Sequence, residues 1–366
     1  MSVMHNTFRS TSSTKRLKFN FAATIALIAL LFSNCGPSEN IPDVSKINVA
    51  LKTYRFDKDL YSIDTNHIAE GLKQLQVKYP DFLNYYLDTV REYHINGNFS
   101  DTVRGIREDL RVDLTFKDFL HLQDTITLLY PDSKETDEKL LDAFKYVQYY
   151  LPGSVVPRIF YLNMGLSKWP TFPVDNNTLC IGLDMFLGDN FPHYAALGVP
   201  PYMLSHTRKS YIPVSLMHTY YQLMHPFAPD DKTLLDLMLQ RGKEQYFLHK
   251  VLPHTPDSVL FGFTQVQLKW CEENEAVIYN YFIHGNLLFN KDPQNVMPYV
   301  VDGPFARGLE DPSHEVKFSP GNIGTWLGYR IVQSYFSQYP ATTLKELLTN
   351  RHDPSRFLDS AKYRPK

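Results

Sequence analysis

The chain has 366 residues, of which 43% are hydrophobic and 14% aromatic, so there is ample material for a folded core. Its 37 basic side chains are slightly outnumbered by 39 acidic ones, which gives a formal net charge of −2 at pH 7. Binding to nucleic acid requires a concentrated basic surface. This balance therefore argues against DNA or RNA as a partner.

Residues 1–34 have the layout of an export signal. A basic stretch comes first, and the apolar run 19–32 follows it. The run has about 14 residues, short of the roughly 20 that a membrane-spanning helix needs, so we expect the segment to be cleaved. Its removal takes away four basic and no acidic side chains, which leaves the mature chain with six more acidic than basic groups.

Cys35 stands directly after this run, in the sequence "FSNCG". The arrangement resembles the lipobox of bacterial lipoproteins, although Phe32 and Asn34 stand where Leu and a small residue are usual. Two or more acyl chains on Cys35 would anchor the protein stably in a membrane. The alternative is a plain secreted protein in which the cysteine is incidental. The polar, proline-containing residues 35–48 are typical of a flexible tether.

The rest of the chain predicts a mainly α-helical α+β protein with a small central β-sheet. Apolar residues recur at helical spacing between about 68 and 151. Residues 157–165 and 177–188 are short apolar runs bounded by Pro, Gly and Asn, which is typical of strands. Helical spacing returns afterwards and continues to about residue 336, with glycines that allow close helix packing at Gly324 and Gly328.

We expect one globular domain over residues 49–366, and the alternative is a helical half, 49–152, followed by a second half, 153–366. Two cysteines remain after Cys35. Cys180 and Cys271 could pair in an oxidising envelope or remain as buried free thiols, because their separation matches no disulfide framework.

One short helical stretch, "SLMHTYYQLMH", resembles the metal-binding helix of a zinc peptidase. In an HExxH helix, histidines one turn apart hold the zinc ion and the intervening Glu activates water. Here His218 fills the first ligand position, but Thr219 and Gln222 stand in place of the general base and the second ligand. His225 lies two turns from His218, about 10 Å along the helix, which is too far for a shared metal ion.

The next predicted helix weakens a zinc site further. The third ligand of such peptidases is a Glu that opens a pattern like "EGxAxYF", whereas this chain has Arg241 at the start of "RGKEQYF". A cation at that position repels a metal ion. Glu244 could supply one carboxylate, and Glu275, at the end of the acidic stretch "WCEENE", could be partly buried. A solvated acidic face is the simpler explanation of that stretch.

Three interpretations of this segment remain. In the first, His218 and a carboxylate serve a zinc-dependent hydrolase. In the second, a degenerate peptidase pocket survives, with the candidate residues His218, Gln222, Arg241, Glu244 and Glu275. In the third, His218 and Gln222 merely flank a core-facing stripe of an ordinary helix. Of these, we favour the interpretations in which the chain has no catalytic residue, no metal ligand and no cofactor.

Longer blocks of sequence resemble a known family. They include "YRFDKDLYSID", "FKYVQYYLPGSVVPRIFYLNMG", "GFTQVQLKWCEENEAVIYNYF" and "SPGNIGTWLGYRIVQSYF", and together they extend from about Tyr54 to Tyr363. In order and spacing they resemble the gliding-motility lipoprotein GldB family. That family is distantly similar to zinc peptidases, which implies a degenerate zincin-like core in residues 153–366.

The resemblance implies an envelope lipoprotein whose domain faces the periplasm and supports gliding or protein secretion. Its expected partners are envelope proteins of a motility or secretion apparatus, together with the membrane that holds the lipid anchor. A zinc-dependent hydrolase remains the alternative. A third option is a module that binds glycan or peptide through the exposed share of 24 Tyr and 24 Phe side chains.

Overall fold

The computed structural model describes residues 41–93, 104–167, 169–309 and 319–366. The chain divides into two units, Met1–Asp43 and Val44–Lys366. The predicted export signal and Cys35 lie outside the described residues. Val44 is 5% exposed and packs in the larger core of the second unit. This residue lies within the range 35–48 that the sequence predicted to be a tether.

The second unit contains a four-stranded mixed sheet with the order β1-β2-β4-β3. The first three strands in this order are parallel and β3 is antiparallel to β4. The predicted strands correspond to β2 and β4, whereas the other two were missed. β1 has only three residues, and β3 contains Pro173, which a sheet tolerates at an edge. The bounds are β1 (Thr53–Arg55), β2 (Arg158–Leu162), β3 (Thr171–Asp175) and β4 (Thr178–Gly182).

The sheet separates two hydrophobic cores, because side chains alternate between its faces. On β2, Ile159 and Tyr161 belong to the larger core, while Phe160 and Leu162 belong to the smaller one. All four are at most 1% exposed. A strand buried on both faces has a continuous apolar sequence, which explains why its run shows no polar alternation.

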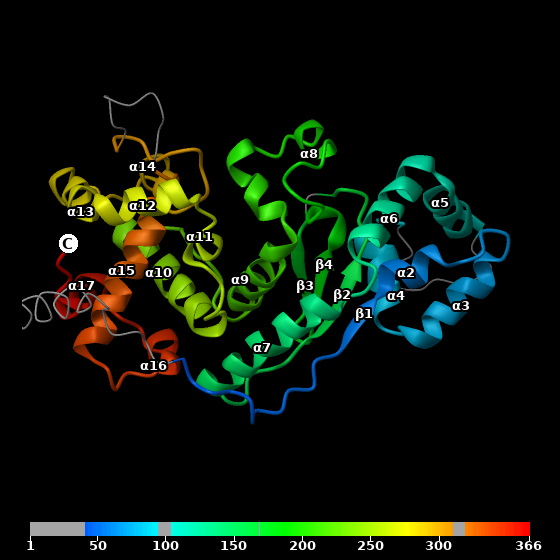
Figure 1. Cartoon of the computed structure of the whole chain (residues 1–366), viewed down its shortest axis with the longest axis horizontal. Coiled ribbons are helices and arrows are strands. Elements are labelled where there is room, and N and C mark those ends of the chain that lie inside the picture. The colour runs from blue at the N-terminus through cyan, green and yellow to red at the C-terminus, as the bar shows by residue number, and fades with distance from the viewer. Residues whose placement is uncertain (1–40, 94–103, 168, 310–318) are drawn as a thin grey trace, which may run out of the picture. The chain divides into compact units, whose positions relative to one another are not determined.

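Helices cover both faces of the sheet, and in Figure 1 α2 to α5 lie on the side away from α7 and α9. Residues of α2 to α5 form the smaller core with one face of the sheet. The helices of this half are α2 (Phe56–Tyr61), α3 (Ile68–Lys78), α4 (Phe82–Tyr85), a π-helical turn (Tyr86–Val90), α5 (Arg104–Thr115), α6 (Lys117–Leu129) and α7 (Lys134–Tyr150).

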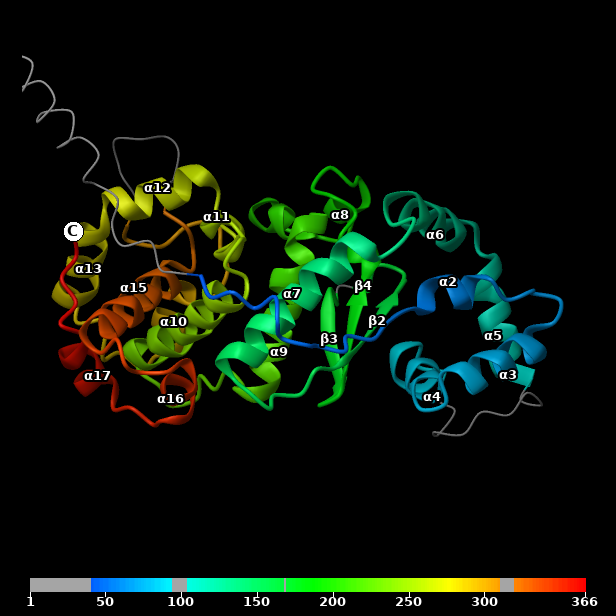
Figure 2. The same cartoon turned by 60° about the horizontal axis from the view of Figure 1, so that its bottom comes forward.

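The larger core extends from the other face of the sheet to the C-terminal helices, and Figure 2 shows α10 and α15 side by side among these helices. The predicted mainly helical α+β class is confirmed. The helices are α8 (His193–Ala196), α9 (Ile212–Met224), α10 (Leu234–Val251), α11 (Asp257–Leu260), α12 (Gln265–Glu273), α13 (Glu275–His284), α14 (Pro293–Val296), α15 (Ile323–Gln338), α16 (Leu344–Thr349) and α17 (Pro354–Ala361), with 3₁₀ turns at Leu183–Met185, Pro201–Thr207, Lys209–Tyr211 and Met297–Tyr299.

Glycines bring α10 and α15 into close contact, as the sequence predicts. A Cβ atom on Gly328 would lie 1.9 Å from the carbonyl oxygen of Met238, and one on Gly242 would lie 2.3 Å from the carbonyl carbon of Gly328. Neither position therefore tolerates a side chain without separating the helices. This crossing brings the N-terminal end of α15 next to the face of α10 that carries the candidate site.

Cys180, on β4, and Cys271, on α12, are both buried free thiols, so the structure favours that alternative over a disulfide between them. Burial raises the pKa of each thiol, which disfavours the reactive thiolate.

Candidate functional site

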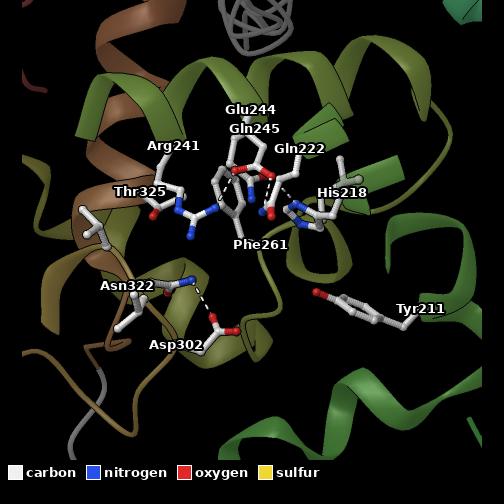
Figure 3. A pocket seen from close by; sticks show the side chains of 13 residues that line it. Tyr211, His218, Gln222, Arg241, Glu244, Gln245, Phe261, Asp302, Asn322 and Thr325 are labelled. Carbon is white, nitrogen blue, oxygen red and sulfur yellow. Dashed lines mark hydrogen bonds and ion pairs between the residues drawn. The ribbon is translucent and has the colours of Figure 1, made fainter. Parts of the chain in front are cut away.

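The helix α9 carries two of the predicted residues on the edge of its core-facing stripe. Met217, Tyr220 and Tyr221 are at most 6% exposed and pack in the larger core. His218 and Gln222 lie one turn apart on the adjacent face, toward α10 (Figure 3). The helix ends before His225, which therefore does not extend the site.

Glu244 of α10 is the centre of the site. Its side chain is 3% exposed, and three groups contact its carboxylate. The Nδ1 atom of His218 lies 3.0 Å from Oε1, and Nε2 of Gln222 donates to the same oxygen at 3.1 Å. Nη1 of Arg241 donates to Oε2 at 2.7 Å (Figure 3). The structure thus brings together four of the five residues that the sequence singles out.

This arrangement holds Glu244 as a carboxylate. Burial alone raises its pKa, but the hydrogen bond and charge of His218, followed by those of Arg241, outweigh burial and lower the pKa to about 2. A group with so low a pKa is a poor proton acceptor near neutral pH. The geometry therefore makes Glu244 an ion-pair partner of Arg241 and a hydrogen-bond partner of His218.

A cavity of about 280 Å³ lies beside this cluster and is closed on its other side by residues from distant parts of the chain. Figure 3 shows Tyr211, Asp302 and Asn322 across the cavity from Glu244. Nδ2 of Asn322 donates to Oδ1 of Asp302 at 2.9 Å. Thr325, in the first turn of α15, completes the wall next to Arg241.

Tyr211 is held in place by a histidine behind it. The ring of His206 stacks on that of Tyr211 with 4.3 Å between centroids and 4° between planes. Burial lowers the pKa of His206, although the charge of Asp302 opposes that shift, so the imidazole is mainly neutral at pH 7. Gly262 passes so close that a Cβ atom there would lie 2.1 Å from Nε2 of His206. The phenol of Tyr211 is therefore held in position by its stacking on His206, which in turn packs against Gly262.

Two buried polar atoms at the cavity have no hydrogen-bond partner among the described residues. They are Oε1 of Gln245 and Nε of Arg241. The guanidinium of Arg241 also lies over the ring of Phe227, 3.9 Å from its centroid, which fixes its orientation. One unsatisfied acceptor and one unsatisfied donor give the cavity the means to bind a polar group by hydrogen bonds.

Glu275 is the predicted residue that lies elsewhere. It opens α13 and is not among the residues that line the cavity. Its carboxylate accepts hydrogen bonds from Nε and Nη2 of Arg330 at 3.0 and 3.2 Å, and from the hydroxyl of Tyr363 at 2.6 Å. Glu275 therefore belongs to an ion pair that joins α13, α15 and the C-terminal segment.

The donor set around His218 does not fit a zinc ion. Arg241 occupies one oxygen of Glu244, and its positive charge repels a metal ion there. Thr219, which stands at the position of the catalytic Glu in an HExxH helix, instead lies with its hydroxyl 2.8 Å from that of Thr171 on β3. Over the described ranges, no group of three or more His, Cys, Asp or Glu side chains could hold a metal ion.

Five polar residues of the cavity were missed from the sequence: Tyr211, Gln245, Asp302, Asn322 and Thr325. Gln245 could have been found, because it directly follows Glu244 within the same motif. The other four come from loops and helix ends that are far from α10 in the sequence. No local pattern marks them, and only the crossing of α15 over α10 brings Asn322 into place.

Within the part of the chain that the structure describes, no helix has the length and apolar character that crossing a membrane requires. Comparison with curated proteins and with solved structures finds no match. A family model described as gliding motility protein GldB matches residues 37–365, which includes both walls of the cavity and the sheet. The chain therefore belongs to the GldB family of gliding motility proteins.

Proposed function

We propose that this protein is a lipid-anchored envelope protein that supports gliding motility, or related envelope and secretion machinery, by binding other proteins and without catalysis. Membership of the GldB family supports the motility context. The sequence supports the anchor, because Cys35 directly follows an export-signal-like apolar run. The partners are envelope proteins on the periplasmic side of the membrane.

One observation supports the non-catalytic role above the others. The carboxylate of Glu244 is neutralised by Arg241 at 2.7 Å and contacts His218 at 3.0 Å. A zinc peptidase needs these positions for metal ligands and a free carboxylate for a general base. In this chain they form an internal ion pair, so the cluster is better suited to stabilising α9 against α10.

The role is tested by replacement of the chromosomal gene in the producing bacterium. We expect a deletion strain to lose gliding or secretion, and a strain carrying His218→Ala to retain both at equal protein abundance. Crosslinking and affinity purification of the mature protein should recover envelope proteins. A deletion strain with normal motility and secretion, or a His218→Ala strain that behaves like the deletion, would contradict the proposal.

The anchor is tested separately with Cys35→Ala. We expect this variant to leave the membrane fraction or to keep its export signal, because stable attachment needs the acyl chains. Metabolic labelling with a fatty-acid analogue should mark the wild-type protein and not the variant. A variant of mature size that stays in the membrane would refute lipidation of Cys35.

A zinc-dependent hydrolase is the alternative that the sequence leaves open, although the pairing of Glu244 with Arg241 and His218 opposes it. Its test is the metal content of the protein after dialysis against zinc-containing buffer. About one equivalent of zinc that is lost in His218→Ala would support this candidate. Less than about 0.1 equivalent would exclude it, since a functional site retains its ion.

A further inference from the structure

A second cavity lies on another side of α10, and four of the nine residues that line it are Lys, Arg or His. It has a volume of about 520 Å³ and is formed by the outer face of α10 and the segment between α16 and α17. Lys232, Lys243 and Arg351 contribute three positive charges, and Asp236 contributes one negative charge. This excess of two positive charges contrasts with a chain that is acidic as a whole.

No carboxylate in the described ranges pairs with these three cations. The ammonium of Lys243 instead lies 5.6 Å from the ring centroid of Phe357. Asp236 is already engaged, because its Oδ2 accepts hydrogen bonds from the backbone and the hydroxyl of Thr233 in the capping box of α10. Asp236 therefore offsets one of the three positive charges in this cavity, and two of them remain without a paired carboxylate among the described residues.

The pKa values of Lys243 and of two neighbouring histidines are lowered in this environment. Burial lowers the pKa of Lys243 to about 8. Burial, followed by the charge of Lys243, lowers the pKa of both His225 and His352, so neither imidazole carries a full charge at pH 7. Nε2 of His352 is enclosed and has no hydrogen-bond partner in the part of the chain that the structure describes. An anion in the cavity would relieve the isolated charge and could satisfy this nitrogen.

We propose that the cavity formed by Lys232, Lys243, Arg351 and His352 binds a phosphoryl group. A dianionic phosphate matches the excess of two positive charges, and lysine and arginine are the usual phosphate-binding side chains. The phosphoryl group belongs either to a free phosphate ester or to the headgroup of a phospholipid. This site is separate from the cavity beside Glu244 and does not depend on the proposed function.

The test is isothermal titration of the purified full-length chain with inorganic phosphate, glycerol 3-phosphate and dihexanoyl phosphatidic acid. Equal affinity for the two esters indicates a free phosphate ester as the ligand, whereas at least about tenfold tighter binding of the short-chain lipid indicates a headgroup. Either result supports the site. Absence of binding up to about 10 mM of all three probes overturns the proposal.

Variants assign the binding to this cavity. Lys243→Gln and Arg351→Gln should each weaken binding about tenfold, as expected for the loss of a charged hydrogen bond. Lys345→Gln removes the same charge from an exposed position on α16 that does not line the cavity, and it should bind like the wild type. Equal weakening in all three variants would show a general charge effect and contradict the assignment.

A second readout depends on Lys243 itself. A bound anion should raise the pKa of Lys243 above its present value of about 8. Binding at pH 8 should then take up a fraction of a proton, measured by titration in two buffers that differ in ionisation enthalpy. The Lys243→Gln variant should lose this uptake while Arg351→Gln keeps it. An unchanged uptake in Lys243→Gln would contradict a direct role of this lysine.

Discussion

Glu244 and Glu275 are two buried glutamates with the same kind of environment, yet only one lies beside the candidate site. Their side chains are each 3% exposed, and each is held by an arginine and by a further hydrogen-bond donor. Beside Glu244 there is a polar cavity with an unsatisfied oxygen on Gln245. The carboxylate of Glu275 is instead enclosed by Arg330 and Tyr363. A buried, paired carboxylate therefore does not mark a site unless polar groups next to it remain unsatisfied.

The strongest test of this comparison is Arg330→Met. It leaves Glu275 buried without its cation, and we expect the free energy of unfolding to fall by about 3 to 5 kcal/mol, as for other broken buried ion pairs. Urea denaturation at pH 7 measures the change. The double variant with Glu275→Gln should recover part of the loss, because it removes the unpaired charge. A loss below about 1 kcal/mol would show that Glu275 is well solvated.

Acid titration probes Glu244 specifically. Its pKa is about 2 in the folded protein and 4.5 in the reference state, so the pair contributes stability that is complete above about pH 4.5 and is lost as the pH falls toward 2. The shift corresponds to about 3 kcal/mol. The difference in unfolding free energy between the wild type and Glu244→Gln should therefore shrink over this range. A difference independent of pH would show that Glu244 is not ionised in the way its contacts imply.

The sequence predicted the helices and the central strands well because their patterns are local. The stripe Met217, Tyr220 and Tyr221 identified α9, and the unbroken apolar runs identified β2 and β4. The strands β1 and β3 were missed, because one is very short and the other carries a proline. Both belong to the sheet only through pairing with distant residues, which no window of local sequence shows.

The site was predictable to the extent that it is built from α9 and α10, which are consecutive long helices in the sequence. His218, Gln222, Arg241 and Glu244 meet because these two helices pack against each other. Glu275 was named as a candidate, although a solvated acidic face was the simpler explanation of its stretch. The structure shows that Glu275 is buried, and its partners on α15 and at the C-terminus are revealed only by the tertiary fold.

The counterpart of Arg330→Met at the candidate site is Arg241→Met. We expect a smaller loss, about 2 kcal/mol, because His218 and Gln222 still contact the carboxylate and the neighbouring cavity admits water. Urea denaturation of both arginine variants under the same conditions gives the comparison directly. If Arg241→Met lowers the free energy of unfolding as much as Arg330→Met does, water in the cavity does not stabilise the unpaired carboxylate of Glu244. The contrast between the two glutamates would then be wrong.

The smallest effects should come from removal of an uncharged hydrogen-bond donor at each glutamate. Tyr363→Phe removes the hydroxyl that donates to Glu275 at 2.6 Å within an enclosed network, and we expect a loss of about 1.5 kcal/mol. Gln222→Ala removes the donor to Glu244 at 3.1 Å from an exposed side chain beside the cavity, and we expect about 0.5 kcal/mol, because water can replace the amide. Chemical denaturation resolves a difference of this size when both variants are measured together. A larger loss in Gln222→Ala than in Tyr363→Phe would mean that Gln222, rather than Arg241, is the main side chain that holds Glu244 in position. It would also mean that the exposed side of the cavity is more ordered than expected.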